Sequence, residues 1–276
     1  MTALLEARPA SVVAEQLTGR DYISFSSIAS FQRCPLAWKF KYLDGLPEET
    51  VSAALVLGGA IHSAAECHFN ELMIGNPAPD LDTLLSVFWE AWRDRAEEAT
   101  IKFGKGEDVN TIGKMADRIL RAFQQSDLAD PKGQIIGVEE QLRGELIPGV
   151  PDLLARIDLI VETDDAVVVT DLKTSRSRWT ADQAEGSGEQ LLLYSELARQ
   201  LVPHKNIRLE FAILTKTAKP VAERWPVTLD APRITRTKQI VEHVWKAMEL
   251  GVYYPAPSPM NCPSCPFREP CRSWSG

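Results

Sequence analysis

Four cysteines have the spacing of metal ligands. Cys34 lies near the start of the 276-residue chain, and Cys262, Cys265 and Cys271 lie in its last fifteen residues. A C-x2-C pair followed by a third cysteine six residues later is typical of zinc sites and of four-cysteine iron–sulfur clusters, which both take four ligands. We therefore predict a metal centre that joins the two ends of the chain, with Cys34 as the fourth ligand.

Disulfide bonds and buried free thiols are the alternatives to this metal centre. Residues 1–20 carry Glu6, Arg8, Glu15 and Arg20 and have no apolar core, so they do not resemble a secretory signal. A cytoplasmic location is therefore expected, and disulfides are rare in that compartment. The spacing alone leaves zinc and a [4Fe–4S] cluster both open.

A second group of residues suited to chemistry lies in a predicted β-hairpin. If its turn is centred between Asp164 and Asp165, Asp158 lies directly opposite Asp171. Directly opposite residues have Cβ atoms ~4.5–5.5 Å apart. Lys173 lies two positions after Asp171, so its side chain projects from the same face. The hairpin therefore brings two carboxylates and one ammonium group together.

Two facing carboxylates destabilise a sheet unless a cation neutralises them. Oxygen ligands suit Mg²⁺ or Mn²⁺, which polarise phosphoryl oxygens and lower the pKa of water. Lys173 would then hold the attacking water or the scissile phosphate. The alternative is a solvated ion-pair patch of Asp158, Asp171 and Lys173 on an exposed sheet face.

The elements that position these residues follow from the periodicity of apolar side chains. A short helix is expected after an N-cap at Ser26 or Ser27, and Pro35 is suited to the first turn of the next helix. Further helices are expected at about 60–74, 84–92, 112–123, 183–201 and 235–250. Strands are expected at 135–146, 155–161, 167–174, 207–214 and 222–229. This order predicts a mixed α/β fold with a helical N-terminal portion.

The predicted domain organisation is a single domain over residues 21–276, preceded by a poorly ordered arm at 1–20. Its expected parts are a helical block at 60–130, a catalytic sheet core at 135–230, and a C-terminal helix with the cysteine tail at 232–276.

The charge distribution is uneven. The net charge of −8 argues against indiscriminate nucleic-acid binding. Residues 66–130 carry a net charge of −6, whereas residues 203–246 carry +5. The basic segment allows a local phosphate-binding surface, although solvated faces of unrelated sign explain the charges equally well. No apolar stretch approaches the ~20 residues of a membrane span, so no membrane partner is expected.

The arrangement Asp158…Asp171-Leu172-Lys173 resembles the active site of the PD-(D/E)xK nuclease superfamily. One cysteine before this core and three after it resemble the iron–sulfur version found in AddB-type and CRISPR-associated RecB-like exonucleases. The resemblance runs from about Phe25 to Cys271. It implies a restriction-endonuclease-like mixed sheet flanked by helices, and it favours a [4Fe–4S] cluster over zinc.

Two further motifs carry the resemblance. Gly59-Ala60-Ile61-His62 is similar to the histidine-bearing helix of the RecB-like branch, and Gln190-Leu-Leu-Leu-Tyr194 is similar to its Q-x3-Y motif. Without the resemblance, His62 would be an ordinary helix-surface partner of Glu66, worth ~0.2–0.5 kcal/mol. Gln190 and Tyr194 would then be a surface amide and a core side chain.

The resemblance implies a role for each residue. Asp158, Asp171, the Leu172 carbonyl and His62 are expected to bind Mg²⁺ or Mn²⁺, and Lys173 is expected to be the catalytic lysine. The glutamine and tyrosine of the Q-x3-Y motif are expected to orient that lysine or touch DNA. Glu139 and Glu140 are additional acids, which are either exposed or reach the site.

The implied function is a metal-dependent DNA exonuclease of the RecB-like branch, acting on DNA ends or single strands in recombination and repair. The first alternative is a CRISPR adaptation nuclease that trims spacer precursors with an integrase partner. The second is a non-catalytic DNA-end-binding subunit. The phosphate-binding motif G-x4-G-K-[ST] is absent, so a helicase partner would be a separate chain.

Overall fold

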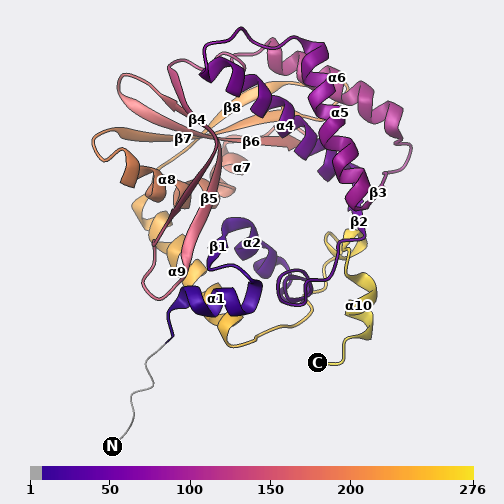
Figure 1. The fold of residues 1–276 in the computed structure, drawn as a ribbon, viewed down its shortest axis with the longest axis vertical. Coiled ribbons are helices and arrows are strands. Elements are labelled where there is room, and N and C mark those ends of the chain that lie inside the picture. Colours follow the sequence, from indigo (N-terminus) through magenta and orange to yellow (C-terminus); the bar gives the residue numbers. More distant parts are fainter. Residues whose placement is uncertain (1–7) are drawn as a thin grey trace, which may run out of the picture. The chain divides into compact units, whose positions relative to one another are not determined.

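The computed structural model of the protein describes residues 8–276 (Figure 1). Its contacts divide the chain into two compact units. The first unit contains the residues up to Glu48 together with Leu142–Ala155 and Thr235–Gly276, and the second contains Glu49–Gln141 and Arg156–Ile234. The single domain expected over residues 21–276 stays a prediction.

The first unit consists mainly of short helices. They are α1 (Ala10–Thr18), α2 (Phe25–Arg33), α3 (Pro35–Trp38), the π-helix η1 (Lys39–Leu43), the 3-10 helix η2 (Cys262–Ser264) and α10 (Arg268–Ser273). Helix α9 (Ala231–Glu249) begins in the second unit and continues into the first. The strand β1 (Tyr22–Ser24) pairs in parallel with the first residues of β5 (Asp152–Glu162), which lie in the same unit.

Trp38 forms the centre of an aromatic group in this first unit. Its ring stacks on Tyr42 and on Tyr253, with ring centroids 5.6 and 5.9 Å apart. Its buried Nε1–H donates to Ser27 Oγ at 2.9 Å, which satisfies a donor that would otherwise lose its hydration. The N-terminal helices are therefore joined to the segment after α9 by aromatic packing.

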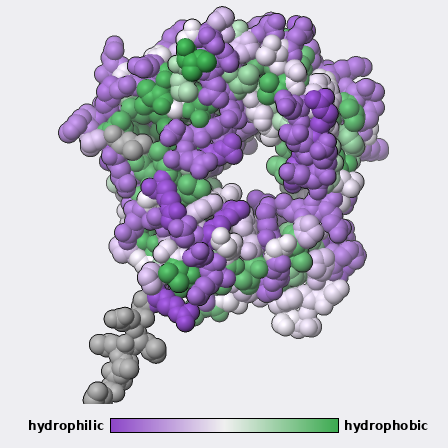
Figure 2. Space-filling view, viewed as in Figure 1, coloured by the Kyte–Doolittle hydropathy of each residue, from purple (hydrophilic) through white to green (hydrophobic). Residues whose placement is uncertain are grey.

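The second unit carries three long helices, and each begins at a side-chain cap. They are α4 (Ala53–Met73), α5 (Leu81–Glu98) and α6 (Val109–Gln124). Ser52, Asp80 and Asp108 accept the free backbone N–H groups of the first turns, which a helix cannot satisfy internally. Figure 2 shows hydrophilic residues along the outer surface of α5, while Leu84, Phe88 and Trp92 on its other face are buried.

The central sheet is mixed, as expected from the sequence. Its strands are β4 (Gln134–Gly144), β5, β6 (Ala166–Ser175), β7 (Asn206–Thr215) and β8 (Ala222–Val227), together with β1. The order is β1-β5-β6-β7-β8, and β4 also pairs with β5. The β5–β6 and β7–β8 pairs are antiparallel, whereas β6 and β7 are parallel. The short strands β2 (Thr50–Ser52) and β3 (Thr100–Lys102), which the sequence analysis did not predict, form a separate parallel pair.

Helices cover both faces of the sheet within the second unit. Helix α4 contacts β6 and α6 contacts β7, and α8 (Glu189–Leu201) contacts both of these strands (Figure 1). The main core joins α4, α5 and α6 to apolar side chains of β5, β6 and β7, including Leu159, Leu172 and Leu214. No described helix is long and apolar enough to cross a membrane.

Two helices begin earlier in the chain than the sequence predicted. Helix α2 is capped by Ser24 rather than by Ser26 or Ser27. Helix α4 begins at Ala53 rather than near residue 60, because Ser52 caps it and Gly58 stays inside it. A Cβ on Gly58 would lie 3.0 Å from Thr174 Oγ1, so close packing against β6 explains the glycine there.

Two expected elements take a different form. The helix predicted at 183–201 is divided into α7 (Ala181–Gly186) and α8. A Cβ on Gly188, between the two, would lie 2.6 Å from Val227 Cγ1, so the break lets the chain pass close to β8. Of the arm predicted at 1–20, residues 1–7 lie outside the described residues. Ala10–Thr18 form α1, which ends at Gly19 in the left-handed conformation.

Candidate metal site and groove

The hairpin register predicted from the sequence is confirmed. Leu159 pairs with Thr170 across β5 and β6, and the next step of this register places Asp158 opposite Asp171. Asp158 Oδ2 also accepts a hydrogen bond of 2.6 Å from the Leu172 backbone N–H. The two predicted carboxylates therefore lie on neighbouring strands, and the backbone itself holds one of them in place.

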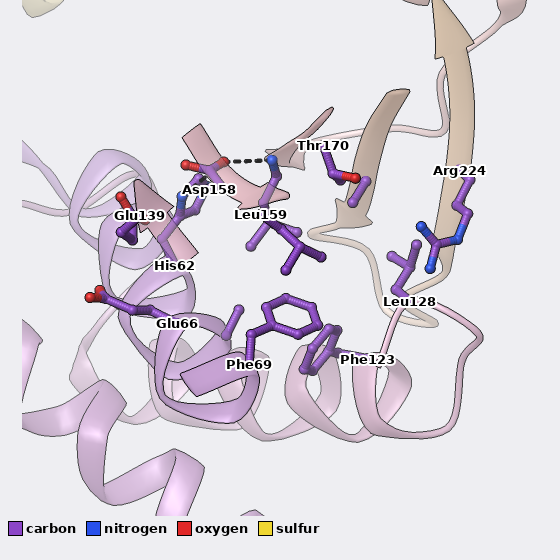
Figure 3. Close-up of a pocket in the computed structure, with 13 residues that line it drawn as sticks. His62, Glu66, Phe69, Phe123, Leu128, Glu139, Asp158, Leu159, Thr170 and Arg224 are labelled. Atoms are coloured by element: carbon purple, nitrogen blue, oxygen red, sulfur yellow. Dashed lines mark hydrogen bonds and ion pairs between the residues drawn. The ribbon is translucent and has the colours of Figure 1, made fainter. Parts of the chain in front are cut away.

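His62, Glu139 and Asp158 offer ligand atoms that all lie within 4.8 Å of one another. In Figure 3, their side chains converge from α4, β4 and β5. His62 Nδ1 is 3.7 Å from Asp158 Oδ2, so the histidine faces the strand carboxylate, unlike in the alternative that pairs it with Glu66. An imidazole and two carboxylates at this spacing fit a divalent cation.

Glu139 is the site residue that sequence reasoning could not place. Its φ of 51° is in the left-handed region, which non-glycine residues rarely occupy. Ile135 and Gly137 are buried at alternate positions of β4, but Leu142 is buried at a position where this alternation would place an exposed residue. An extra residue that bends a strand and redirects a side chain is typical of a β-bulge, and bulges are frequent beside active sites. The strand expected at 135–146 is therefore interrupted at Glu139, where the left-handed backbone turns this acid towards the site.

Burial and neighbouring charges shift the pKa values of Asp158, His62 and Glu66. Burial raises the pKa of Asp158 well above its ordinary value, and the charges of Asp171 and Glu139 add to the rise. The pKa of His62 is lowered by burial, against the opposing effect of Asp171. Burial and the charge of Glu139 also raise the pKa of Glu66. A divalent cation would relieve these effects, because it favours charged carboxylates and a neutral imidazole.

A chain of polar contacts leads away from Asp171. Lys173 Nζ lies 2.7 Å from Asp171 Oδ2, close enough for an ion pair although the two groups are not aligned for a hydrogen bond. Lys173 Nζ also donates to Gln190 Oε1 at 3.4 Å, and Gln190 Nε2 donates to Tyr194 Oη at 3.0 Å. The predicted lysine, glutamine and tyrosine therefore form one connected set.

Tyr194 is the buried end of this set. Burial raises its pKa to about 12, so its hydroxyl stays protonated at neutral pH and can hold the Gln190 amide in one orientation. Asp171 is only 4% exposed and is not part of the group that His62, Glu139 and Asp158 form. The Leu172 carbonyl contributes a hydrogen bond that opposes the fall in the His62 pKa. Metal binding by Asp171 and by this carbonyl stays a prediction.

A groove of about 760 Å³ runs over the site. One wall is a single face of α4, from Ala54 to Glu66, and the other carries Arg156, Asp158 and Lys173. A cavity of about 20 Å³ lies beneath the site and is lined by Phe69, Phe123 and Leu128 among other residues (Figure 3). The groove, rather than this cavity, is therefore the space open to a substrate.

The four predicted cluster cysteines all lie in the first unit. Each is a free thiol. Cys34, Cys265 and Cys271 pack against a small core of Leu36, Phe40 and Phe267. The charges of the other three cysteines raise the pKa of Cys265, after the larger effect of burial, so the four thiols lie near one another.

Backbone N–H groups point at two of these sulfur atoms. Ala256 N donates to Cys34 Sγ at 3.5 Å, and Ser258 N donates to Cys262 Sγ at 3.2 Å. Such donors stabilise thiolates and are common around iron–sulfur clusters. The donor set of four thiols with N–H support fits a four-cysteine centre.

Comparison with known proteins identifies the family of this chain. A family model for the PD-(D/E)XK nuclease superfamily matches residues 22–272. No curated protein matches the sequence. The crystal structure of a "Putative exonuclease" from Eubacterium rectale aligns with a TM-score of 0.60 and 18% identity, over 99% of this chain and 93% of that one, a likeness of fold alone. The structure of SSO0001 aligns with a TM-score of 0.35 and 14% identity, over 79% of this chain and 84% of that one, and supports no argument.

Proposed function

Because the chain belongs to the PD-(D/E)XK nuclease superfamily, we propose that it is a metal-dependent DNA exonuclease of the RecB-like branch. It would hydrolyse phosphodiester bonds at DNA ends or in single strands during recombination and repair. The observation that carries this proposal is the group of His62, Glu139 and Asp158 within 4.8 Å, beside the ion pair of Asp171 and Lys173.

The residues of this group would hold Mg²⁺ or Mn²⁺. His62, Glu139 and Asp158 supply one nitrogen and two carboxylate donors, and Asp171 supplies a buried oxygen with no hydrogen-bond partner among the described residues. When bound, the cation supplies charge neutralisation at the phosphate and acidification of a water molecule. Imidazole favours Mn²⁺ over Mg²⁺, because it is a softer ligand than a carboxylate.

Lys173 would hold the attacking water or a phosphate oxygen through its ammonium group. Its Nζ is placed between Asp171 and Gln190, so it cannot swing freely in the groove. Gln190 is in turn fixed by Tyr194. Orientation by a second layer of hydrogen bonds is how enzymes keep a catalytic group within the narrow range of productive geometry.

The four cysteines would hold a [4Fe–4S] cluster with a structural role. Backbone N–H groups that donate to Cys34 Sγ and Cys262 Sγ support this proposal, because such donors stabilise thiolate ligands. Partnership with a helicase or integrase chain stays a prediction.

The test of the proposed function is a cleavage assay on single- and double-stranded DNA, labelled at either end, with Mg²⁺, Mn²⁺ or EDTA. We expect stepwise shortening from an end in Mn²⁺ and Mg²⁺ and none in EDTA. A closed circular single strand separates the modes of cleavage, because an exonuclease leaves it intact. No cleavage of any substrate by protein with correctly bound metal would contradict the proposal.

A further inference from the structure

Three basic side chains line the groove, and they differ in their ion-pair partners. Arg156 forms an ion pair with Glu139, and Lys173 forms one with Asp171. Lys216, at the end of β7, lines the same groove and has no ion pair among the residues that the structure describes. Its Nζ donates a hydrogen bond of 3.4 Å to the Ala54 carbonyl oxygen.

The surroundings of Lys216 favour an anion. The side chain is half-buried, and burial lowers its pKa. The nearby charge of Arg176 lowers the pKa further, and Glu107 only partly offsets it. Arg176 also has no ion pair among the described residues. Lys216 and Arg176 therefore repel one another more strongly than Glu107 attracts Lys216, and a bound anion would relieve that repulsion.

The groove between Lys216 and the metal site has room for a nucleic-acid backbone. Lys216 contacts the first turn of α4, and His62 lies eight residues further along that helix, about 12 Å at 1.5 Å per residue. Between them the α4 wall carries Leu55, Gly58 and Gly59. A Cβ on Gly59 would meet nothing within 4 Å, so the wall opens onto free space there.

We propose that Lys216 binds a backbone phosphate of the DNA strand that flanks the phosphate cut at the metal site. This inference rests on the proposed function and adds a positioning residue to it. The three acids of the metal site repel a phosphodiester chain until they are neutralised. A cation further along the groove supplies the attraction that keeps the strand in register. Lys216 therefore acts on substrate binding rather than on the bond that breaks.

The test uses single-stranded DNA of ten nucleotides with a fluorescent end, titrated with the whole protein in Ca²⁺ at several KCl concentrations. Lys216→Met keeps the aliphatic stem and removes the charge, and Lys216→Arg restores the charge. Lys132→Met is the matched control, because Lys132 is an exposed lysine of the same unit outside the groove. We expect Lys216→Met to weaken binding about tenfold and to reduce the salt slope by about 0.7, the value for one phosphate contact on a single strand.

Position along the strand is tested with oligonucleotides that carry one neutral methylphosphonate linkage. A neutral linkage at one flanking position should weaken DNA binding by wild-type protein. The same neutral linkage should not weaken binding by Lys216→Met any further. An unchanged dissociation constant and salt slope for Lys216→Met, or identical linkage profiles, would overturn the inference alone. Wild-type protein that neither binds nor cuts DNA would instead overturn the proposed function, and the inference with it.

Discussion

The two candidate metal sites differ in what holds their ligands in place. In the second unit, the ligands project from a long helix and from the strands of a sheet, and Asp158 is fixed by a backbone hydrogen bond. In the first unit, the cysteines lie on or beside elements of three to nine residues, and Cys262 is exposed. The sheet therefore organises the carboxylate site before any cation binds, whereas we expect the cysteine site to depend on the proposed metal centre for its structure.

This difference has opposite consequences for stability. Buried acids repel one another when no cation neutralises them, so removal of the cation from the carboxylate site should destabilise the fold that organises it. The cysteine site has little packing of its own beyond Leu36, Phe40 and Phe267. Loss of its ligand should therefore unfold the surrounding segments rather than relieve strain.

The largest expected effect is on catalysis in the second unit. Asp171→Asn or Lys173→Ala should reduce DNA cleavage by roughly a thousandfold or more, equivalent to about 4 kcal/mol of transition-state stabilisation. The measurement is the initial rate in Mn²⁺, with circular dichroism to show that each variant is folded. Cleavage at the wild-type rate by folded Asp171→Asn would remove this residue from the active site.

The next effect separates the two units. Cys271→Ser should lower the stability of the first unit by several kcal/mol, since a bound metal or cluster contributes directly to folding. Hydrogen exchange followed by mass spectrometry should show lost protection in α2, α3 and α10, with β6 and β7 still protected. Cys67→Ser, on α4 of the second unit, is the control. Equal loss of protection in both units would contradict the division between the sites.

The wild-type protein tests the proposed cluster. When isolated without oxygen, it should be brown and hold about four iron atoms per chain, as a [4Fe–4S] cluster requires. A colourless, active preparation with one zinc per chain would replace iron by zinc while leaving the structural role intact.

A smaller effect is expected at the bulge. Glu139→Gln should weaken Mn²⁺ binding about 10- to 100-fold, because it removes one charged donor and leaves the others in place. Glu140→Gln is the matched control, since Glu140 is the next residue on the strand and is exposed. Equal Mn²⁺ affinities for the two variants would show that Glu139 serves only its ion pair with Arg156.

The smallest effect is a gain of stability. The pKa of Asp158 is raised from its ordinary value of 3.8 in the folded protein, so the metal-free fold loses stability as the pH rises through that raised pKa. Asp158→Asn should therefore have a free energy of unfolding about 1 kcal/mol higher than wild type in EDTA at pH 8, and a higher melting temperature. The gain should shrink towards pH 4. A lower melting temperature for Asp158→Asn under these conditions would show that the empty site is not strained.

The sequence predicted those parts of the site that depend on local geometry. The turn at Asp164–Asp165 sets the register, and the register alone brings Asp158 and Asp171 together. Alternation along β6 then places Lys173 beside Asp171. These relations need only the period of a strand and the position of a turn.

The parts that were missed depend on distant contacts. Helix α4 begins seven residues before its predicted start, because the packing of Gly58 against Thr174 depends on a strand more than a hundred residues away. The left-handed backbone of Glu139 is equally invisible in a pattern of residue types. One signal was present: two adjacent acids, Glu139 and Glu140, interrupt the apolar alternation of their strand.

The most direct test of the carboxylate site is calorimetric titration of Mn²⁺ into the protein without DNA. Wild-type protein and the double variant His62→Ala, Asp158→Asn are compared, each with its cysteine centre intact. The account predicts saturable Mn²⁺ binding to wild type and loss of that binding in the double variant. Equal Mn²⁺ binding by both proteins would contradict the assignment of this site.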